Sequence, residues 1–151
     1  MRVYRLVNYK YAGDLTGEGA RLYGGRWNHV GVPCIYASET RSLALLEFSV
    51  NVQLQNILRN LNMVVLDIPD AYREIDIADL PGNWRDSPAP ASTKDFGSGI
   101  LKNNNSTAII KIPSAVIPQE FNYLINPAHI SIAQCKVVDI SDFIYDVRIK
   151  V

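Results

Sequence analysis

The last third of the chain holds strand-like segments that follow one another without a helix between them, and this pattern most constrains the fold. The segments are residues 107–112, 121–125, 131–140 and 143–149. Pro113 ends the first segment, Asn126-Pro127 marks a turn after the second, and Ser141-Asp142 separates the last two. Parallel neighbours would need a long crossover, usually a helix, between successive strands. The sequence therefore predicts a largely antiparallel sheet in a protein of the α+β class.

The middle of the chain adds further strands and a long helix. Residues 32–37 and 62–68 are short apolar runs typical of strands. Between them, apolar residues recur at spacings of three and four, which predicts a helix over residues 40–58 with Ser38 as its N-cap. The recurring residues are Leu43, Leu46, Val50, Leu54 and Ile57. Proline and glycine interrupt the segment that follows, where only a short helix at residues 91–96 is expected.

The composition is that of an ordinary globular domain. A chain of 151 residues, 48% of them hydrophobic, can bury a core without metal or disulfide support, so we expect one domain over residues 1–151. Lys and Arg total 15, as do Asp and Glu, and the net charge is therefore zero. Because a nucleic-acid-binding surface normally needs a basic stripe, no direct contact with nucleic acid is expected.

The lack of targeting signals and the use of cysteine both indicate a cytoplasmic protein. No apolar run approaches the length needed to cross a bilayer, so no membrane contact is expected. Residues 1–5 lead into a strand-like pattern rather than a signal peptide. Cys34 and Cys135 lie far apart without metal-ligand spacing, and we interpret them as reduced structural thiols.

Glycine is concentrated in one region, which is the first indication of a functional site. Six of the nine glycines lie between Gly13 and Gly31. Such a cluster allows a ligand to approach the backbone closely, and long loops in small domains tend to be functional. The cluster is neither a dinucleotide fingerprint, because Leu22 stands where the third glycine would be, nor a phosphate-binding P-loop.

Two charged residues are candidates for this site. Glu47 lies along the apolar stripe of the expected helix. A carboxylate on this core-facing side needs a cation, several hydrogen-bond donors or an open cleft. The alternative is a stripe-edge residue that reaches solvent or pairs with Arg41 or Arg59. Arg26 follows two glycines and is suited to bind a phosphate with its planar guanidinium. Its alternative is stacking on a neighbouring aromatic ring, Trp27 or Tyr23.

Other kinds of chemistry have weaker support. Tyr36 at the end of a strand can stack on a base or pack in the core, and Ser114 lies in a turn after Pro113. The chain has two histidines, His29 and His129, and no Gly-x-Ser-x-Gly motif. A Cys–His nucleophile remains open, and no cluster of side chains has the spacing of a metal site.

The order of these motifs resembles the RES domain family, which is named for its Arg, Glu and Ser. The chain contains Gly-Gly-Arg-Trp-Asn, Tyr-Ala-Ser and Leu-Leu-Glu in the expected order, then IPSAVIPQEFNYLINPAH and FIYDVR. The resemblance spans essentially the whole chain. It implies an ADP-ribosyltransferase-like fold, in which a split mixed sheet and flanking helices surround a cleft that binds NAD.

The resemblance also implies roles for individual residues. Arg26 matches the family arginine and would bind the diphosphate of NAD, while Tyr36 would pack on the nicotinamide side. Glu47 matches the glutamate and would stabilise charge on the ribose. Arg5, in a Tyr-Arg element near the N-terminus, would add a second phosphate contact. Ser114 is the best match for the serine and would bond a ribose or phosphate oxygen, with Ser98 and Ser106 as alternatives.

The implied activity is that of a bacterial toxin that depletes NAD by cleaving the nicotinamide–ribose bond, by hydrolysis or phosphorolysis. NAD is then consumed as substrate, and neither a metal nor a separate cofactor is required. The implied partner is an Xre-like antitoxin that binds DNA and blocks the cleft, and a homodimer is possible. Two other functions stay open: an ADP-ribosyltransferase that modifies a specific protein, and a non-catalytic interaction module.

Overall fold

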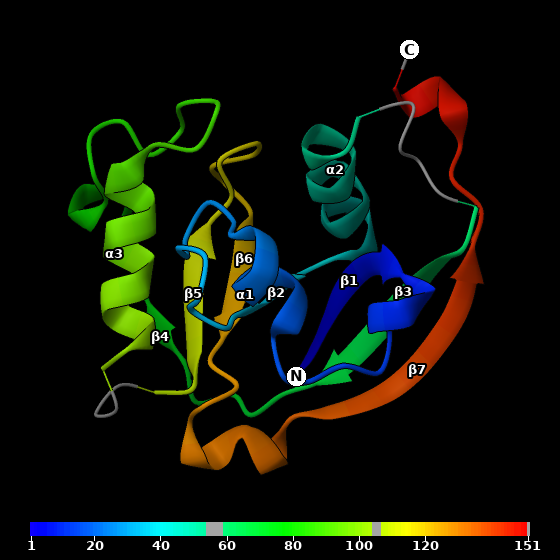
Figure 1. Cartoon of the computed structure of the whole chain (residues 1–151), viewed down its shortest axis with the longest axis horizontal. Coiled ribbons are helices and arrows are strands. Elements are labelled where there is room, and N and C mark those ends of the chain that lie inside the picture. Colours follow the sequence, from blue (N-terminus) through cyan, green and yellow to red (C-terminus); the bar gives the residue numbers. More distant parts are fainter. Residues whose placement is uncertain (54–58, 104–106, 151) are drawn as a thin grey trace.

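A mixed sheet forms the centre of the protein (Figure 1), and the computed structural model describes residues 1–53, 59–103 and 107–150. The sheet has seven strands in the order β4-β5-β6-β2-β1-β3-β7. The strands are β1 (Arg2–Asn8), β2 (Ile35–Ser38), β3 (Leu61–Asp67), β4 (Arg73–Glu74), β5 (Ile109–Pro113), β6 (Phe121–Ile125) and β7 (Lys136–Phe143). All neighbours pair antiparallel except β4 and β5. The expected α+β class and largely antiparallel sheet are confirmed.

The sheet is split into two wings between β1 and β2. β1 pairs with β3 along its whole length, from Arg2 opposite Asp67 to Asn8 opposite Leu61. With β2 it is joined only where Tyr4 lies opposite Ser38. Beyond this point the two strands diverge, so β4, β5, β6 and β2 form one wing and β1, β3 and β7 the other (Figure 1).

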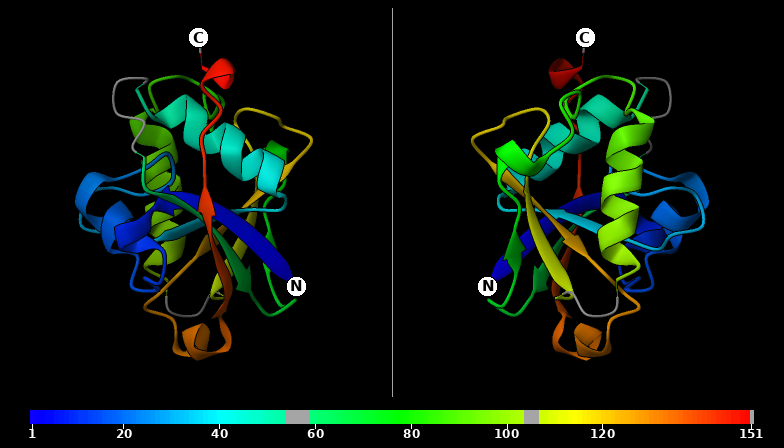
Figure 2. Two further views of the ribbon diagram at one scale, coloured as in Figure 1. Left: turned by 90° about the vertical axis from the view of Figure 1, so that its right-hand side faces the viewer. Right: turned by 90° about the vertical axis from the view of Figure 1, so that its left-hand side faces the viewer.

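Three α-helices accompany the sheet within the described residues: α1 (Glu18–Tyr23), α2 (Arg41–Asn51) and α3 (Ala91–Leu101). α3 runs beside β5, whereas α2 lies over the β1–β2 side of the sheet (Figures 1 and 2). Short 3₁₀ helices occur at Tyr9–Tyr11, Ile77–Asp79, Ile130–Gln134 and Val147–Ile149. None of the described helices is both long enough and apolar enough to span a membrane.

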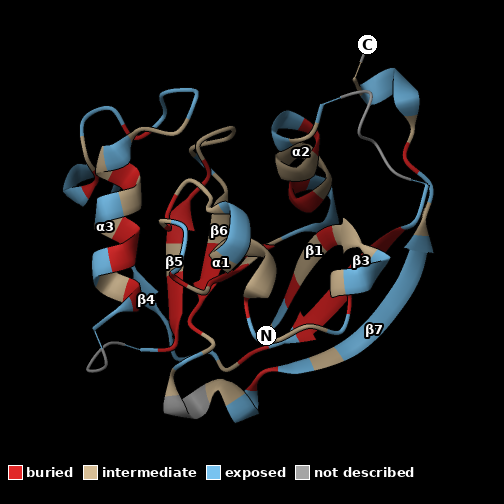
Figure 3. Cartoon of the chain, viewed as in Figure 1, coloured by how far each residue is buried: buried red, intermediate tan, exposed pale blue. Residues whose placement is uncertain are grey.

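The core consists of three clusters. Successive side chains of a strand point to opposite faces of the sheet, so each face has its own buried residues. Val3, Val64 and Ile125 belong to a cluster on one face of the sheet. On the opposite face, Ile112 and Leu124 pack with α3 residues such as Leu101. A third cluster, which contains Leu6, Ala44, Leu61, Met63 and Tyr145, lies under α2. Burial is therefore greatest in the central strands and on the inner sides of the helices, whereas the edge strand β7 is largely exposed (Figure 3). α3 thus packs on the wing that contains β5 and β6, and α2 on the wing that contains β1 and β3.

The glycine-rich region is more ordered than a loop, because α1 forms within it. Gly17 and Gly24 flank this helix with positive φ angles, which glycine adopts without strain. β2 begins at Ile35, three residues later than the expected strand at residues 32–37.

The helix after β2 begins later than the sequence predicts. Ser38 is not the N-cap, because it continues β2 and pairs with Asn122. Thr40 caps the helix instead, and its hydroxyl accepts a hydrogen bond from the Leu43 N–H at 3.0 Å.

The apolar stripe expected on this helix is also shorter. α2 ends at Asn51, and Val50 is 53% exposed rather than part of the core. Leu43 and Ala44 carry the buried face. Residues 54–58, which include Leu54 and Ile57, lie outside the described part of the chain.

Two further expectations were wrong in the second half of the chain. α3 continues to Leu101 rather than ending at residue 96, because Gly97 is not a breaker but packs against Trp27. Ser141 and Asp142 do not form a turn: both remain in β7, where they pair with β3, and the Asn62 amide donates to the Ser141 carbonyl and the Asp142 carboxylate. The strand expected at residues 131–140 is confirmed from Lys136 onward, whereas residues 131–134 belong to the 3₁₀ helix Ile130–Gln134. Of the strand expected at residues 143–149, only Phe143 lies in β7, and residues 147–149 form the 3₁₀ helix Val147–Ile149.

Candidate functional site

A cavity of about 730 Å³ lies at the split between the two wings. It is lined by parts of β1, β2, α2 and β6 and by the glycine-rich segment. Four of the candidate residues line it from four different parts of the chain: Arg5, Arg26, Tyr36 and Glu47. The volume is in the range of pockets that bind small molecules and cofactors. The tertiary structure therefore brings together residues that are dispersed over the first third of the sequence.

Glu47 is half-buried on α2, and one of its carboxylate oxygens is held by two donors. Oε1 accepts a hydrogen bond from the Ser114 hydroxyl at 2.7 Å and from the Asn122 amide at 2.6 Å. The ion pairs of the described residues do not include Glu47, and Arg41 lies instead over the ring of Tyr4. Polar donors and an adjoining cavity thus satisfy this carboxylate, rather than a cation on the helix surface.

Ser114 is fully buried, and its hydroxyl is fully used. Oγ accepts hydrogen bonds from the backbone N–H groups of Val116 and Ile117, both at 3.1 Å, and donates its proton to Glu47. A hydroxyl has one donor and two acceptor positions, so none remains for a substrate. The expected bond from Ser114 to a ribose or phosphate oxygen is replaced here by one to the glutamate.

The other serines considered have different positions. Ser98 is buried in α3 and accepts a hydrogen bond from the backbone N–H of His29 at 2.9 Å. It is not among the residues that line the cavity. Ser106 lies outside the described residues.

Arg26 is anchored through one nitrogen of its guanidinium. Nη1 donates to the backbone carbonyls of Trp84 at 2.9 Å and Asp86 at 2.8 Å. Within the described part of the chain, no hydrogen bond from Nε or Nη2 is recorded, so this edge of the guanidinium is left for an anion. Arg binds carboxylate or phosphate bidentately in this geometry. Burial lowers the pKa of the guanidinium, while the charge of Glu47 opposes that shift. The alternative of stacking on Trp27 or Tyr23 is not realised, because the cation–π contacts of the described residues do not include Arg26. The Trp27 ring packs edge-on against Phe96.

Tyr36 connects β2 to the segment that carries Arg26. Its hydroxyl donates to Asn28 Oδ1 at 2.6 Å and accepts from the Trp27 backbone N–H at 3.0 Å. Burial raises the pKa of this hydroxyl well above its ordinary value, so it stays protonated and keeps both bonds. A side chain at Gly25 would meet the hydroxyl, with 2.7 Å from its Cβ to the Tyr36 oxygen. The Gly-Gly sequence before Arg26 thus permits close packing on Tyr36.

We expect Tyr36→Phe to lower the free energy of unfolding by about 1–2 kcal/mol, since two buried polar groups lose their partner. The groups are the Trp27 N–H and Asn28 Oδ1. Denaturant unfolding of the purified variant measures the change. Tyr23→Phe is the matched control, because that ring is 77% exposed and should leave stability within about 0.5 kcal/mol. Equal stability of both variants would contradict the assignment.

Arg5 lies at the β1 side of the same cavity and is incompletely bonded. Its Nη1 reaches the Asp14 carbonyl at 3.5 Å, whereas the buried Nε has no hydrogen-bond partner among the described residues. Burial lowers the pKa of this guanidinium. A buried N–H without a partner costs free energy, and Nε itself is not exposed to the cavity.

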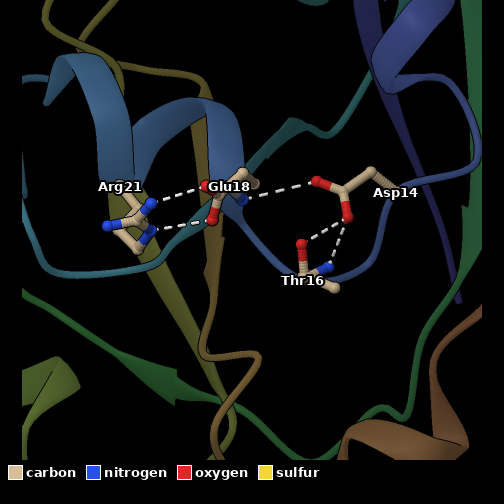
Figure 4. A network of polar contacts seen from close by, with 4 residues as sticks. All are labelled: Asp14, Thr16, Glu18 and Arg21. Atoms are coloured by element: carbon tan, nitrogen blue, oxygen red, sulfur yellow. Dashed lines mark hydrogen bonds and ion pairs between the residues drawn. The ribbon is translucent and has the colours of Figure 1, made fainter.

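A network of polar contacts organises the segment next to Arg5 (Figure 4). The Asp14 carboxylate accepts from the N–H and hydroxyl of Thr16, at 2.8 and 2.5 Å, and from the Glu18 N–H at 3.3 Å. Glu18 in turn pairs with Arg21 at 2.6 Å. Desolvation acts to raise the pKa of Asp14, but these hydrogen bonds outweigh it and lower the pKa. The network fixes the start of α1, so hydrogen bonds hold this wall of the cavity in place.

The remaining candidates do not form a nucleophile or a metal site in the described residues. Cys34 and Cys135 are free and buried, and burial raises the pKa of both thiols. His29 pairs with Asp95 at 2.6 Å. Across the part of the chain that the structure describes, no group of three or more His, Cys, Asp or Glu side chains could hold a metal ion.

Sequence reasoning missed two asparagines of the site. Asn28 receives the Tyr36 hydroxyl, and Asn122 holds Glu47. Asn122 had one detectable signal: it is a polar residue within the otherwise apolar strand β6. Asn28 ends the Gly-Gly-Arg-Trp-Asn block quoted above, but nothing in that block predicts its bond to Tyr36, because its burial depends on the fold around it.

Comparisons with known proteins agree with this architecture. The family model described as RES domain matches residues 2–146. A protein named Toxin Res from Yersinia enterocolitica is 39% identical and covers 99% of this chain and 100% of its own length. A protein named Prs ADP-ribosylating toxin from a Sphingobium species is 37% identical over 91% of this chain and 87% of its own length.

Among solved structures, the M. tuberculosis MbcT–MbcA toxin–antitoxin complex contains a chain with the same fold. Its TM-score is 0.74, and the match covers 94% of this chain and 83% of that chain. The sequence identity is 17%, so this likeness concerns the fold alone.

Proposed function

The chain belongs to the RES domain family, and from that premise we propose that it is a toxin that cleaves the nicotinamide–ribose bond of NAD. The observation that carries this proposal is the shared cavity of about 730 Å³, lined by Arg26 and Glu47. The cavity thus offers a guanidinium for a diphosphate and a fixed carboxylate for a ribose. The proposed enzyme is one domain, residues 1–151.

Glu47 would act on the charge that develops as the bond breaks. The pyridinium leaves as neutral nicotinamide, and positive charge builds up on the ribose carbon. A carboxylate that is already held in place stabilises this charge more strongly in a cavity than in water. Because Ser114 and Asn122 bind Oε1, the other oxygen of Glu47 is available to the substrate.

Arg26 and Arg5 would bind the diphosphate of NAD from two sides of the cavity. The Nη1 anchoring of Arg26 supports this role, and Arg5 lines the same cavity. Binding of the remote part of the substrate positions the reacting carbon. Tyr36 also lines the cavity and would pack on the nicotinamide side.

We expect Arg26→Ala to weaken NAD binding at least about tenfold, because a charge-assisted contact is lost while Glu47 is retained. Calorimetric titration of NAD measures the affinity. Arg85→Ala is a suitable control, because this exposed arginine donates to the Ala115 carbonyl and does not line the cavity. Normal affinity in the Arg26 variant would refute the diphosphate assignment.

The products distinguish the possible acceptors. Purified protein is incubated with NAD, with and without inorganic phosphate, and the products are identified by mass spectrometry. Release of nicotinamide together with ADP-ribose indicates hydrolysis, and a phosphorylated ADP-ribose indicates phosphorolysis. A non-catalytic interaction module is favoured instead if the purified protein consumes no NAD and if the NAD level of cells that express it stays constant.

Transfer of ADP-ribose to a specific protein is the second candidate function. It is favoured by the relative at 37% identity that is named a Prs ADP-ribosylating toxin. Mass spectrometry of protein targets after incubation with NAD tests it, since the transferred group then appears on a protein rather than free in solution.

We further propose an antitoxin as the partner. The fold is shared with a chain from a toxin–antitoxin complex, and an antitoxin segment that enters the cavity would exclude NAD. The balance of 15 basic and 15 acidic residues suits a toxin whose Xre-like partner, rather than the toxin itself, contacts DNA. Cytoplasmic NAD would be the substrate, and a homodimer is compatible with this arrangement.

A further inference from the structure

A relay of hydrogen-bonded side chains leads from the sheet to the Glu47 carboxylate; its first member, Ser38, is buried, and Asn122 and Glu47 are half-buried. Ser38 and Asn122 lie directly opposite each other on β2 and β6. The Ser38 hydroxyl is 2.7 Å from Asn122 Oδ1, and Asn122 Nδ2 is 2.6 Å from Glu47 Oε1. Ser38, Asn122 and Glu47 all line the cavity.

The direction of each hydrogen bond in this relay follows from its chemistry. An ionised carboxylate only accepts, so the amide group of Asn122 that faces Glu47 must be the NH₂. Its carbonyl oxygen then faces Ser38 and must receive the hydroxyl proton of that serine. Ser38 thus fixes which way the amide of Asn122 points, and a rotated amide would present its oxygen to the carboxylate.

The relay complements the bond from Ser114. Ser114 approaches Oε1 from the turn after β5, whereas Asn122 approaches it from the middle of the sheet. Two donors from different segments restrict rotation of the carboxylate more than one donor does. Among the described residues, no hydrogen bond to Oε2 is recorded, so Oε1 is the anchored oxygen and Oε2 the one left for the substrate.

We propose that Asn122, oriented by Ser38, is a positioning residue that holds the Glu47 carboxylate in its reactive orientation. The inference rests on the proposed function, since the orientation matters only if Glu47 acts on NAD. A merely structural amide would affect folding, whereas a positioning amide affects the chemical step through Glu47 alone.

The test compares variants in kcat and in NAD affinity. Asn122→Leu keeps the branched shape and number of heavy atoms of the side chain and removes the amide, and we expect kcat to fall about tenfold while the Kd for NAD changes less than about twofold. Ser38→Ala removes only the orienting hydroxyl, and we expect a fall in kcat of about threefold. This second variant keeps the test valid if Asn122→Leu does not fold.

Asn62→Leu is the matched control. Asn62 is another strand asparagine that donates to a carboxylate, that of Asp142 at 3.1 Å; it is buried but does not line the cavity. Its replacement should alter stability and leave kcat per folded molecule unchanged.

A double-mutant cycle with Glu47→Gln separates positioning from other effects. If Asn122 acts through Glu47, its replacement lowers kcat in the wild-type background and causes no further loss in the Glu47→Gln background. Wild-type kcat in Asn122→Leu or in Ser38→Ala, or an equal fall in both backgrounds, overturns the positioning role while NAD cleavage stands. A wild-type protein that does not consume NAD overturns the proposed function and this inference together.

Discussion

Glu47→Gln is expected to lower NAD turnover by about a hundredfold or more while the protein still folds, the scale seen when a fixed electrostatic stabiliser is removed. Glutamine keeps the shape of the side chain and an oxygen that can accept from Ser114 and Asn122. What it loses is the negative charge beside the ribose. The measurement is the initial rate of nicotinamide release by purified variant, with NAD at saturating concentration.

The control for this prediction is another half-buried glutamate. Glu39 accepts a hydrogen bond from the Phe121 N–H at 3.1 Å but does not line the cavity. Glu39→Gln should therefore retain turnover close to that of the wild type. Unchanged turnover in Glu47→Gln, with folding verified by circular dichroism, would remove Glu47 from the chemistry.

Gly97→Ala is expected to destabilise the protein by about 3 kcal/mol, because α3 packs directly on the backbone of the segment that carries Arg26. A Cβ at Gly97 would lie 1.9 Å from the Trp27 carbonyl oxygen. The obstacle is backbone rather than a flexible side chain, so either the helix or the segment must move. Denaturant unfolding measures the loss, and a weakened NAD affinity should accompany it.

Gly99→Ala is the matched control on the same helix. Its added Cβ would meet nothing within 4 Å, and the residue is exposed. Since alanine is the better helix former, this variant should be as stable as the wild type or more stable by up to about 1 kcal/mol. If both variants unfold alike, the contact of Gly97 with Trp27 does not support the cavity wall.

Elements with a regular pattern were predicted well, because local periodicity reports burial. The strands around residues 62–68 and 121–125 match β3 and β6 within a residue at either end. Boundaries were less successful where tertiary pairing overrides local signals. Ser38 is of a residue type that often caps helices, but it stays in β2 because it pairs with Asn122 across the sheet.

The C-terminal strand illustrates the same limit. Ser141-Asp142 reads as a turn, yet the Asn62 amide binds both residues and keeps β7 extended beside β3. No property of residues 131–149 alone contains this information. The partner lies 79 residues earlier in the chain.

The sequence by itself determined the α+β class, the candidates Arg26, Tyr36 and Glu47, and the family to which they point, because side-chain type and periodicity are local properties. Only the tertiary structure decided how these residues are used. The donors that hold Glu47 are Ser114 and Asn122, which lie 67 and 75 residues away, and they meet it because strand register and the placement of α2 bring distant segments together. Hydrogen-bond geometry of this kind depends on differences in distance of a few tenths of an ångström, and the spacing of residues in the sequence does not specify such distances.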